Sequence, residues 1–312
     1  MTCLSIITPA YNEASNLPLL YQRIVETTLR VGVEWEWVIV DDHSSDRTFG
    51  AVEDLAVSDA RVRGIRLSRN SGSHVAITCG LHHATGEAAV TMSADLQDPP
   101  EMLGPLLERW RRGAQVVWAV RRGRSGGPVH VFFAALYYWM MRHLVGMKDM
   151  PSHGADFFLL DRTVIDAFRK FPERNVSVLA LITWLGFRQE QLDYDKQPRA
   201  RGRSGWTLAR KRKLVMDSIT GFSDFPIRFC SYAGLALIAS GFVVAIIGLA
   251  LVPSLTAAFV LLVALGVGLG GLQLFALGMV GQYVWRGLDE SRRRPPYVIE
   301  SMVGDREAAR LG

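Results

Sequence analysis

Residues 229–285 contain no charged side chain, and this stretch restricts the fold of the 312-residue chain more than any other feature. It is far too long for one membrane-spanning helix, which needs about 20 apolar residues, but it fits two. Arg228 precedes it and Arg286 follows it, so the positive-inside tendency places both flanks in the cytoplasm. The stretch therefore predicts a C-terminal two-helix transmembrane hairpin. The spacing of Gly266 and Gly270 allows close helix approach, within the hairpin or between subunits of a homo-oligomer.

The chain before this stretch alternates apolar strand-like runs with helical patterns. Strands are expected at 4–8, 36–40, 62–67, 88–92 and 115–120, with helices at 16–29 and 73–85. Such alternation predicts an α/β fold in which a mainly parallel sheet has helices on both faces. Pro9 follows the first strand where a dinucleotide-binding dehydrogenase would place a glycine-rich fingerprint, which disfavours hydride transfer to a nicotinamide.

Charge and cysteine content indicate the cellular compartment and the binding partners of the protein. The net charge is +5, but residues 196–213 hold eight Lys or Arg and no acid, which indicates a phosphate or an anionic membrane surface. Nucleic acid is a less favoured partner, because an apolar membrane segment follows almost at once. The three cysteines are scattered and odd in number, as in a reduced compartment without disulfides. The start of the chain lacks the features of a signal peptide.

An acidic residue follows the strand expected at 88–92. Asp95 and Gln97 would lie at the carboxyl end of that strand, where open α/β sheets bind ligands. A carboxylate and an amide oxygen there can share a divalent cation and a diphosphate. The alternative is that Asp95 and Asp98 only cap the helix that begins at Pro99.

The second strand also ends in an acid, Asp41. Its carboxylate can accept two hydrogen bonds from the base or ribose of a nucleoside. Pro9, Tyr11 and Glu13, after the first strand, would form a wall of the same pocket. The alternative for the neighbouring Asp46 is a helix cap.

Three further segments have two interpretations each. The polar turn 69–72 meets phosphate through Arg69 or its amides, or is an ordinary turn before a helix. Asp156, at the mouth of another short apolar strand, orients or deprotonates a nucleophile, or pairs with an arginine. The aromatic-rich segment 130–145 is too short to span a bilayer and is interpreted as an interfacial helix rather than a buried one.

These pieces occur in an order that resembles membrane-anchored family 2 glycosyltransferases of the polyprenyl-phosphate type, including dolichol-phosphate mannose synthases and bactoprenol glucosyltransferases. The resemblance rests on residues 9–13, 41–42, 69–72, 94–101, 154–157, 222–226 and 294–297. It implies a GT-A-like catalytic domain with interfacial helices and the hairpin. It also implies four regions: a cytoplasmic nucleotide-sugar-binding catalytic domain at 1–195, a basic acceptor loop with a juxtamembrane helix at 196–228, two transmembrane helices at 229–285 and a cytoplasmic tail at 286–312.

The resemblance also assigns roles to residues. Asp95 and Asp156 would be catalytic, and Asp95 and Gln97 would hold Mg²⁺ or Mn²⁺. The nucleotide sugar would contact Pro9, Tyr11, Glu13, Asp41, Asn70, Ser93 and Asp95, and the acceptor phosphate would contact Arg121, Arg199, Arg201, Arg203 and Ser204. Two positions depart from the family pattern: Ser93 replaces an acid, and Gly205 replaces a lysine.

The function implied is an inverting transfer of a sugar from a nucleotide-diphosphate donor to polyprenyl phosphate at the inner (cytoplasmic) membrane. A multi-pass protein with its catalytic domain in the cytoplasm, contacting the lipid bilayer and no nucleic acid, is expected. One alternative is a processive polysaccharide synthase, although its longer channel and Gln-x-x-Arg-Trp motif are not found. The other is a catalytically impaired, membrane-tethered nucleotide-binding scaffold, which Ser93 and Gly205 make conceivable.

Overall fold

The computed structural model describes residues 3–122, 151, 156–171, 177–195, 197, 225–251 and 255–304. The chain forms two compact units. The first combines residues 1–212 with residues 295–312, and the second comprises residues 213–294. The C-terminal tail thus belongs to the same unit as the N-terminal strands.

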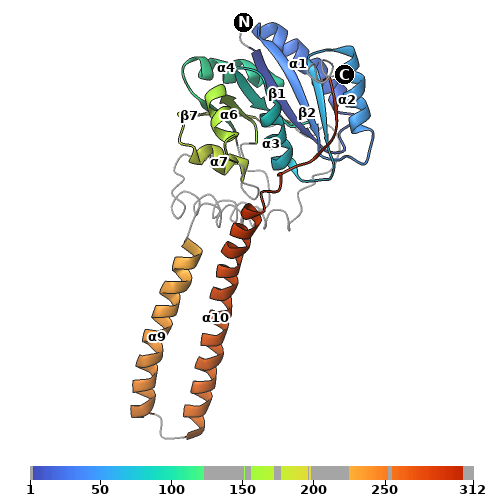
Figure 1. Cartoon of the computed structure of the whole chain (residues 1–312). Coiled ribbons are helices and arrows are strands. Elements are labelled where there is room, and N and C mark those ends of the chain that lie inside the picture. Colours follow the sequence, from blue (N-terminus) through green and yellow to red (C-terminus); the bar gives the residue numbers. More distant parts are fainter. Residues whose placement is uncertain are drawn as a thin grey trace. The chain divides into compact units, whose positions relative to one another are not determined.

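The first unit is built on an eight-stranded mixed sheet (Figure 1). Its strands are β1 (Cys3–Ala10), β2 (Glu34–Asp41), β3 (Val62–Leu67), β4 (Ala88–Thr91), β5 (Val116–Arg121), β6 (Phe158–Asp161), β7 (Gln189–Tyr194) and β8 (Ile299–Val303), in the order β7-β5-β6-β4-β1-β2-β3-β8. The β4-β1-β2-β3 part is parallel, as the sequence predicts. In contrast, β6 runs antiparallel to β4 and β5, and β8 runs antiparallel to β3.

Helices cover both faces of this sheet, as expected. One face carries α1 (Leu17–Val31), α2 (Thr48–Ser58) and α4 (Leu103–Arg111), the last preceded by a 3-10 turn, η1 (Pro100–Met102). The other carries α3 (Ser73–His83), α6 (Arg162–Phe168) and α7 (Val178–Trp184). Alternate residues of one strand enter different cores: Trp37 packs with α1 and α2, whereas Val38 packs with α3. Burial on both faces explains the nearly continuous apolar runs of these strands.

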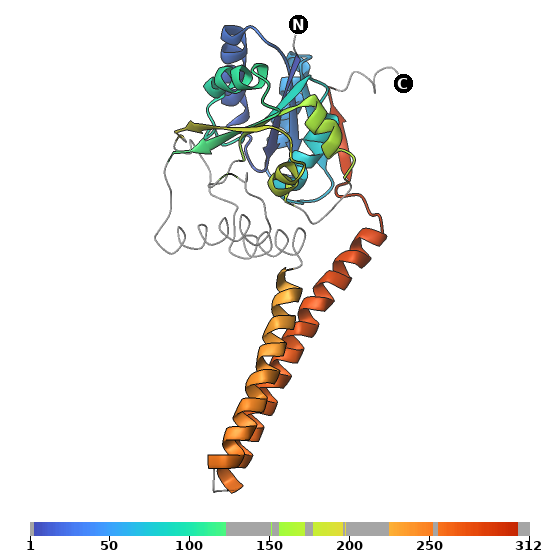
Figure 2. The ribbon, with the colours of Figure 1, turned by 90° about the vertical axis from the view of Figure 1, so that its left-hand side faces the viewer.

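The tail strand β8 lies at the β3 edge of the sheet, where Figure 2 shows it in red. Close packing at this edge depends on Gly64 of β3. A Cβ atom added there would collide with Val52 of α2 and Val303 of β8. β7 and β8 are not predicted from the sequence, because each is a short and partly polar segment.

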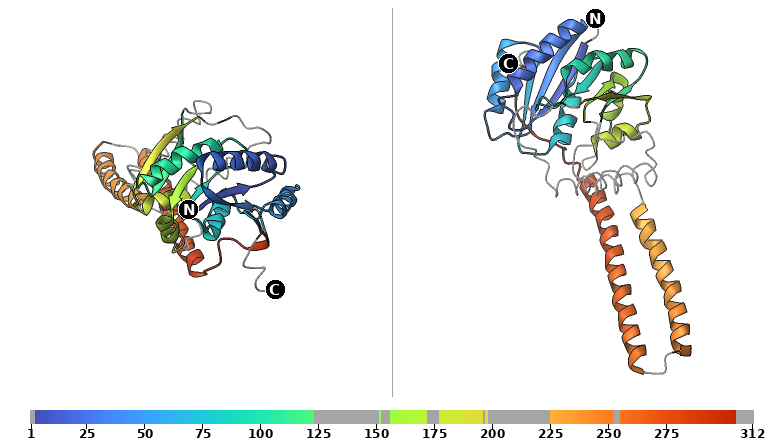
Figure 3. Two further views of the ribbon diagram at one scale, coloured as in Figure 1. Left: turned by 90° about the horizontal axis from the view of Figure 1, so that it is seen from above. Right: turned by 180° about the vertical axis from the view of Figure 1, so that it is seen from behind.

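The second unit contains α9 (Phe225–Leu251) and α10 (Leu255–Ser291), which contact each other and run antiparallel, as the right-hand view of Figure 3 shows. Gly234 faces Leu272 across the pair. A Cβ atom added at Gly266 or Gly270 would meet no atom of the described residues within 4 Å. Among the described residues, no helix is long and apolar enough to cross a membrane, and the predicted transmembrane hairpin is therefore not confirmed.

Candidate functional site

The strand pairing brings three predicted segments to one edge of the sheet. β1 lies between β2 and β4, all three are parallel, and their carboxyl ends therefore point the same way. β6 is antiparallel to β4, with Phe158 opposite Thr91, so the chain enters β6 at this same edge. The Thr91 hydroxyl donates to the carbonyl of Asp156 at 2.8 Å and fixes that entry. Asp41, Asp95 and Asp156 are thus carried by segments that meet at this edge.

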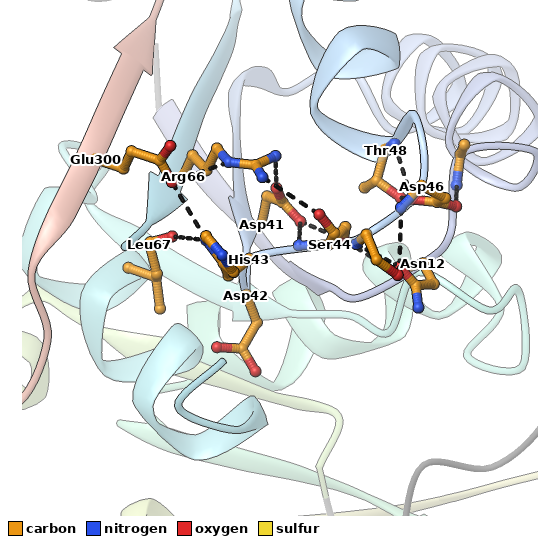
Figure 4. A network of polar contacts seen from close by, with 12 residues as sticks. Asn12, Asp41, Asp42, His43, Ser44, Asp46, Thr48, Arg66, Leu67 and Glu300 are labelled. Atoms are coloured by element: carbon orange, nitrogen blue, oxygen red, sulfur yellow. Dashed lines mark hydrogen bonds and ion pairs between the residues drawn. The ribbon is translucent and has the colours of Figure 1, made fainter. Parts of the chain in front are cut away.

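The tip of β2 is a dense polar network (Figure 4). Asp41 is wholly buried, and its Oδ1 accepts hydrogen bonds from the amide and the hydroxyl of Ser44. Its Oδ2 accepts from Nη1 of Arg66 on β3 at 3.0 Å. Both oxygens therefore already have protein donors, and the buried carboxylate is held rigidly in place.

The turn before α3 is organised by Asp42, which points away from the Asp41 network in Figure 4. Its carboxylate accepts from the amides of Ser71 at 2.6 Å and Gly72 at 2.8 Å, and its carbonyl accepts from Asn70 Nδ2 at 3.3 Å. The expectation that these two amides bind phosphate is therefore wrong, because Asp42 occupies them. The ordinary-turn alternative describes their role, and a phosphate contact by Arg69 stays a prediction.

The loop after β1 joins the same network. Asn12 adopts the left-handed conformation (φ 57°), and its Oδ1 accepts from the amides of Ser45 and Asp46. Asp46 in turn accepts from the Thr48 amide at 2.9 Å in the turn before α2, whose N-cap residue is Arg47 and not Asp46. The ring of Tyr11 beside this loop is 43% exposed.

Pro9 and Glu13 border the same loop. Pro9 is half-buried at the end of β1, and the Glu13 amide donates to the Thr48 hydroxyl at 2.8 Å. The Glu13 carboxylate accepts from Asn16 Nδ2. The predicted wall residues therefore lie next to the β2 tip.

A second polar cluster follows β4. The Ser93 hydroxyl lies 2.8 Å from Asp95 Oδ1 and 2.5 Å from Asp98 Oδ2, and the Ser93 amide donates to Asp98 Oδ2 at 3.1 Å. Asp98 Oδ1 accepts from the buried Tyr194 hydroxyl at 2.7 Å. Asp98 therefore supports the loop that carries Asp95. As a helix cap it would instead accept hydrogen bonds from the amides of the next helix. Burial, followed by the negative charge of Asp98, raises the pKa of Tyr194, so the phenol remains a donor.

Asp95 and Gln97 provide oxygen atoms that suit a hard divalent cation. Asp95 is buried, and its Oδ1 also accepts from the Gln97 amide at 3.2 Å. Gln97 Nε2 donates to the carbonyl of Gln197 at 3.3 Å, which fixes the side-chain amide. Among the described residues, no three His, Cys, Asp or Glu side chains gather in a metal-binding group.

Asp156 is 47% exposed and lies 3.9 Å from the guanidinium of Arg121, so the ion-pair alternative is present in the structure. Burial disfavours the charge of Arg121, but Asp156, Tyr194 and Asp98 outweigh it and raise the pKa of the guanidinium. Burial also lowers the pKa of His74 at the start of α3, which the charge of Asp156 opposes. Arg121 thus links Asp156 electrostatically to the Asp98 cluster.

Several of the predicted site residues fall in segments that the structure does not describe. Arg199, Arg201, Arg203, Ser204 and the segment 130–145 lie outside the described residues. Conversely, Ser44, Arg66 and Tyr194 take part in the site and were not predicted. β3 carries two basic residues, Arg63 and Arg66, among apolar ones, and this is the signal that points to Arg66.

The chain matches the family model described as glycosyl transferase family 2 over residues 5–169. It is 37% identical over 309 residues to the uncharacterized glycosyltransferase YkcC of Bacillus subtilis, covering 96% of this chain and 94% of that protein. It is 31% identical over 304 residues to the bactoprenol glucosyl transferase of Shigella phage SfV, covering 96% and 98%. Both relatives therefore match nearly the whole chain, whereas the family model covers its N-terminal half.

Among solved structures, the fold is similar to glucosyl-3-phosphoglycerate synthase from Mycobacterium tuberculosis in complex with Mn²⁺, UDP-glucose and phosphoglyceric acid. The TM-score is 0.50 at 15% identity, covering 70% of this chain and 78% of that chain. At this identity the likeness concerns the fold alone. It confirms the expected GT-A-like α/β architecture.

Proposed function

Because the chain belongs to glycosyl transferase family 2, we propose that it transfers a sugar from a nucleotide diphosphate to polyprenyl phosphate with inversion, giving a lipid-linked monosaccharide. The observation that carries this proposal is the meeting of the Asp41, Asp95 and Asp156 segments at one sheet edge. The acceptor class follows from the relative named bactoprenol glucosyl transferase, which the chain covers almost completely.

In this proposal the nucleoside lies at the β2 tip. Pro9, Tyr11 and Glu13 line it from the loop after β1, Asp41 lies beneath it, and Asn70 borders it from the turn before α3. Support comes from the pairing of Ala10 with Asp41, which places these segments side by side. The diphosphate would extend from there toward Ser93 and Asp95 after β4.

Asp95 and Gln97 would hold Mg²⁺ or Mn²⁺ between the protein and the diphosphate. When bound, the cation supplies positive charge that stabilises the leaving nucleoside diphosphate. Ser93 would orient Asp95 through its hydroxyl, because this hydroxyl lies within hydrogen-bond distance of the carboxylate. The chain would therefore use one carboxylate and a hydroxyl where two acids are usual.

The reaction needs no strong base. An oxygen of the acceptor phosphate, already ionised at neutral pH, would form a bond to the anomeric carbon while the bond from that carbon to the diphosphate breaks. Asp156 would position the acceptor, and its ion partner Arg121 would contact the acceptor phosphate. Arg199, Arg201, Arg203 and Ser204 are proposed to complete the phosphate site.

We also propose that residues 229–285 anchor the enzyme in the inner membrane with both flanks in the cytoplasm. The stretch carries no charged residue. Since residues before and after it join one sheet, the chain must leave and return on the same side of any membrane. Fractionation of the expressed protein with alkaline carbonate tests the anchor: release of the full-length protein into the soluble fraction would contradict it.

The decisive test uses purified full-length protein, Mg²⁺ or Mn²⁺, a panel of sugar nucleotides and polyprenyl phosphate, with the product identified by mass. We expect one sugar to be added to the lipid, and Asp95→Ala to abolish the transfer. The control Asp54→Ala, on the exposed face of α2, should leave it unchanged. A repeating polymer would instead favour a polysaccharide synthase, and nucleotide binding without turnover would favour a scaffold.

A further inference from the structure

Glu300 of the tail strand β8 reaches the tip of β2. Its Oε2 lies 3.1 Å from Nε of Arg66 and 3.2 Å from Nδ1 of His43. Figure 4 shows Glu300 entering this network from β8, on the side of Arg66 opposite Ser44. A residue separated from Arg66 by more than two hundred positions therefore completes the polar network at this end of the site.

Arg66 is clamped between two carboxylates. Nη1 binds the buried Asp41, Nε binds Glu300, and Nη2 donates to the carbonyl of Ser44 at 3.3 Å. A buried carboxylate depends on a well-oriented positive partner, because the cost of removing its charge from water is large. Glu300 holds the far end of the guanidinium and so limits the orientations in which Arg66 can serve Asp41.

Glu300 also contacts His43. This residue has φ 57°, and its Nδ1 is 3.1 Å from the carbonyl of Leu67 and 3.2 Å from Glu300. Both neighbours are acceptors, so Nδ1 carries the proton and the ring tautomer is fixed. The imidazole next to Asp41 is thereby held in one orientation at the turn that leaves β2.

We propose that Glu300 is a positioning residue for the nucleoside end of the donor site, acting through Arg66 and His43. This inference rests on the proposed function, because it assigns the β2 tip to the nucleoside. It makes β8 part of the donor site. Glu300 therefore affects the binding of the sugar-nucleotide donor. It affects neither the binding of the acceptor nor the transfer step.

The test compares full-length wild type with Glu300→Gln, which keeps the shape of the side chain and removes its charge. The matched control is Glu53→Gln, an exposed glutamate of α2. We expect the KM for the sugar nucleotide to rise about tenfold in Glu300→Gln, as for loss of one charge-assisted contact. The kcat and the KM for polyprenyl phosphate should stay within about twofold of wild type.

Arg66→Lys provides the second variant, because an ammonium cannot bind two carboxylates as the guanidinium does. In the Arg66→Lys background, Glu300→Gln should change the donor KM by about twofold or less. The reason is that Arg66, through which Glu300 mainly acts, has already been replaced. Fully additive effects would overturn the proposal. A parallel decrease in kcat and increase in both KM values would also overturn it, because this pattern indicates general disruption of the fold.

Titration with UDP and GDP separates this inference from the proposed function. A wild-type protein that binds one of them but transfers no sugar would contradict the transferase proposal. In that case the Kd values still decide the role of Glu300: an increase of about tenfold in Glu300→Gln supports it, and an unchanged Kd refutes it. A wild type that binds neither nucleotide would overturn both.

Discussion

The hydroxyl of Tyr194 gives the sharpest test of how the Asp95 loop is held. Tyr194 ends β7 and is almost wholly buried, and its hydroxyl donates to Asp98 Oδ1 at 2.7 Å. Its ring packs edge-on against Phe157, with 5.6 Å between the ring centroids. Tyr194→Phe keeps this ring contact and removes the hydrogen bond to Asp98 together with the interaction of the hydroxyl with Arg121.

The expected loss follows from the charge of the acceptor. A hydrogen bond to a charged group contributes about 1.5–3 kcal/mol, and a domain of roughly 150–250 residues loses about 2–4 °C of Tm per kcal/mol. We therefore expect the Tm of Tyr194→Phe to fall by about 3–12 °C. The transfer rate should fall about tenfold or more, because Asp98 also binds Ser93, the neighbour of Asp95.

Thermal unfolding followed by circular dichroism and a sugar-transfer assay measure the two effects. Tyr232→Phe is the control, because Tyr232 is 70% exposed on α9 and should change neither quantity. If Tyr194→Phe keeps the wild-type Tm within about 1 °C and the full transfer rate, the hydrogen bond does not hold the loop and the reasoning is wrong.

Two further predictions concern the sheet. Gly64→Ala should lower the free energy of unfolding by about 1–3 kcal/mol, because the new Cβ collides with Val52 and Val303; a denaturant titration that shows no loss would contradict this packing. Burial disfavours the charge of Glu36, but hydrogen bonds from Ser5 and Thr85 and the charge of Arg63 outweigh it and lower its pKa. Its contribution to stability is therefore complete above the unfolded-state pKa of about 4.3 and is lost as the pH falls below it, so Tm measured from pH 7 to pH 3 should decrease less steeply in Glu36→Gln than in wild type.

The central part of the sheet was predictable because its strands are buried on both faces. The expected strand at 62–67 coincides with β3, and the helix expected at 73–85 is α3. β8 was not predictable in the same way. Its residues are partly polar, and it becomes a strand only through pairing with β3, a partner far away in the sequence.

The residues of the candidate site also divide into those that the sequence predicts and those that it does not. Strand ends located Asp41 and Asp95, since parallel strands place their carboxyl ends at one edge. The sequence could not reveal that both oxygens of Asp41 accept hydrogen bonds from Ser44 and Arg66, because this depends on side-chain directions across two strands. It also could not reveal that Asp98 supports Ser93, which stands where a second acid was expected.

The position of β8 also affects how the protein is made. Its partner β3 leaves the ribosome more than two hundred residues earlier, which at about 5–20 residues per second is roughly 10–50 s. During that time the outer edge of β3 offers unpaired backbone groups to any other extended chain. Pairing with β8 removes this exposed edge once the tail has been made.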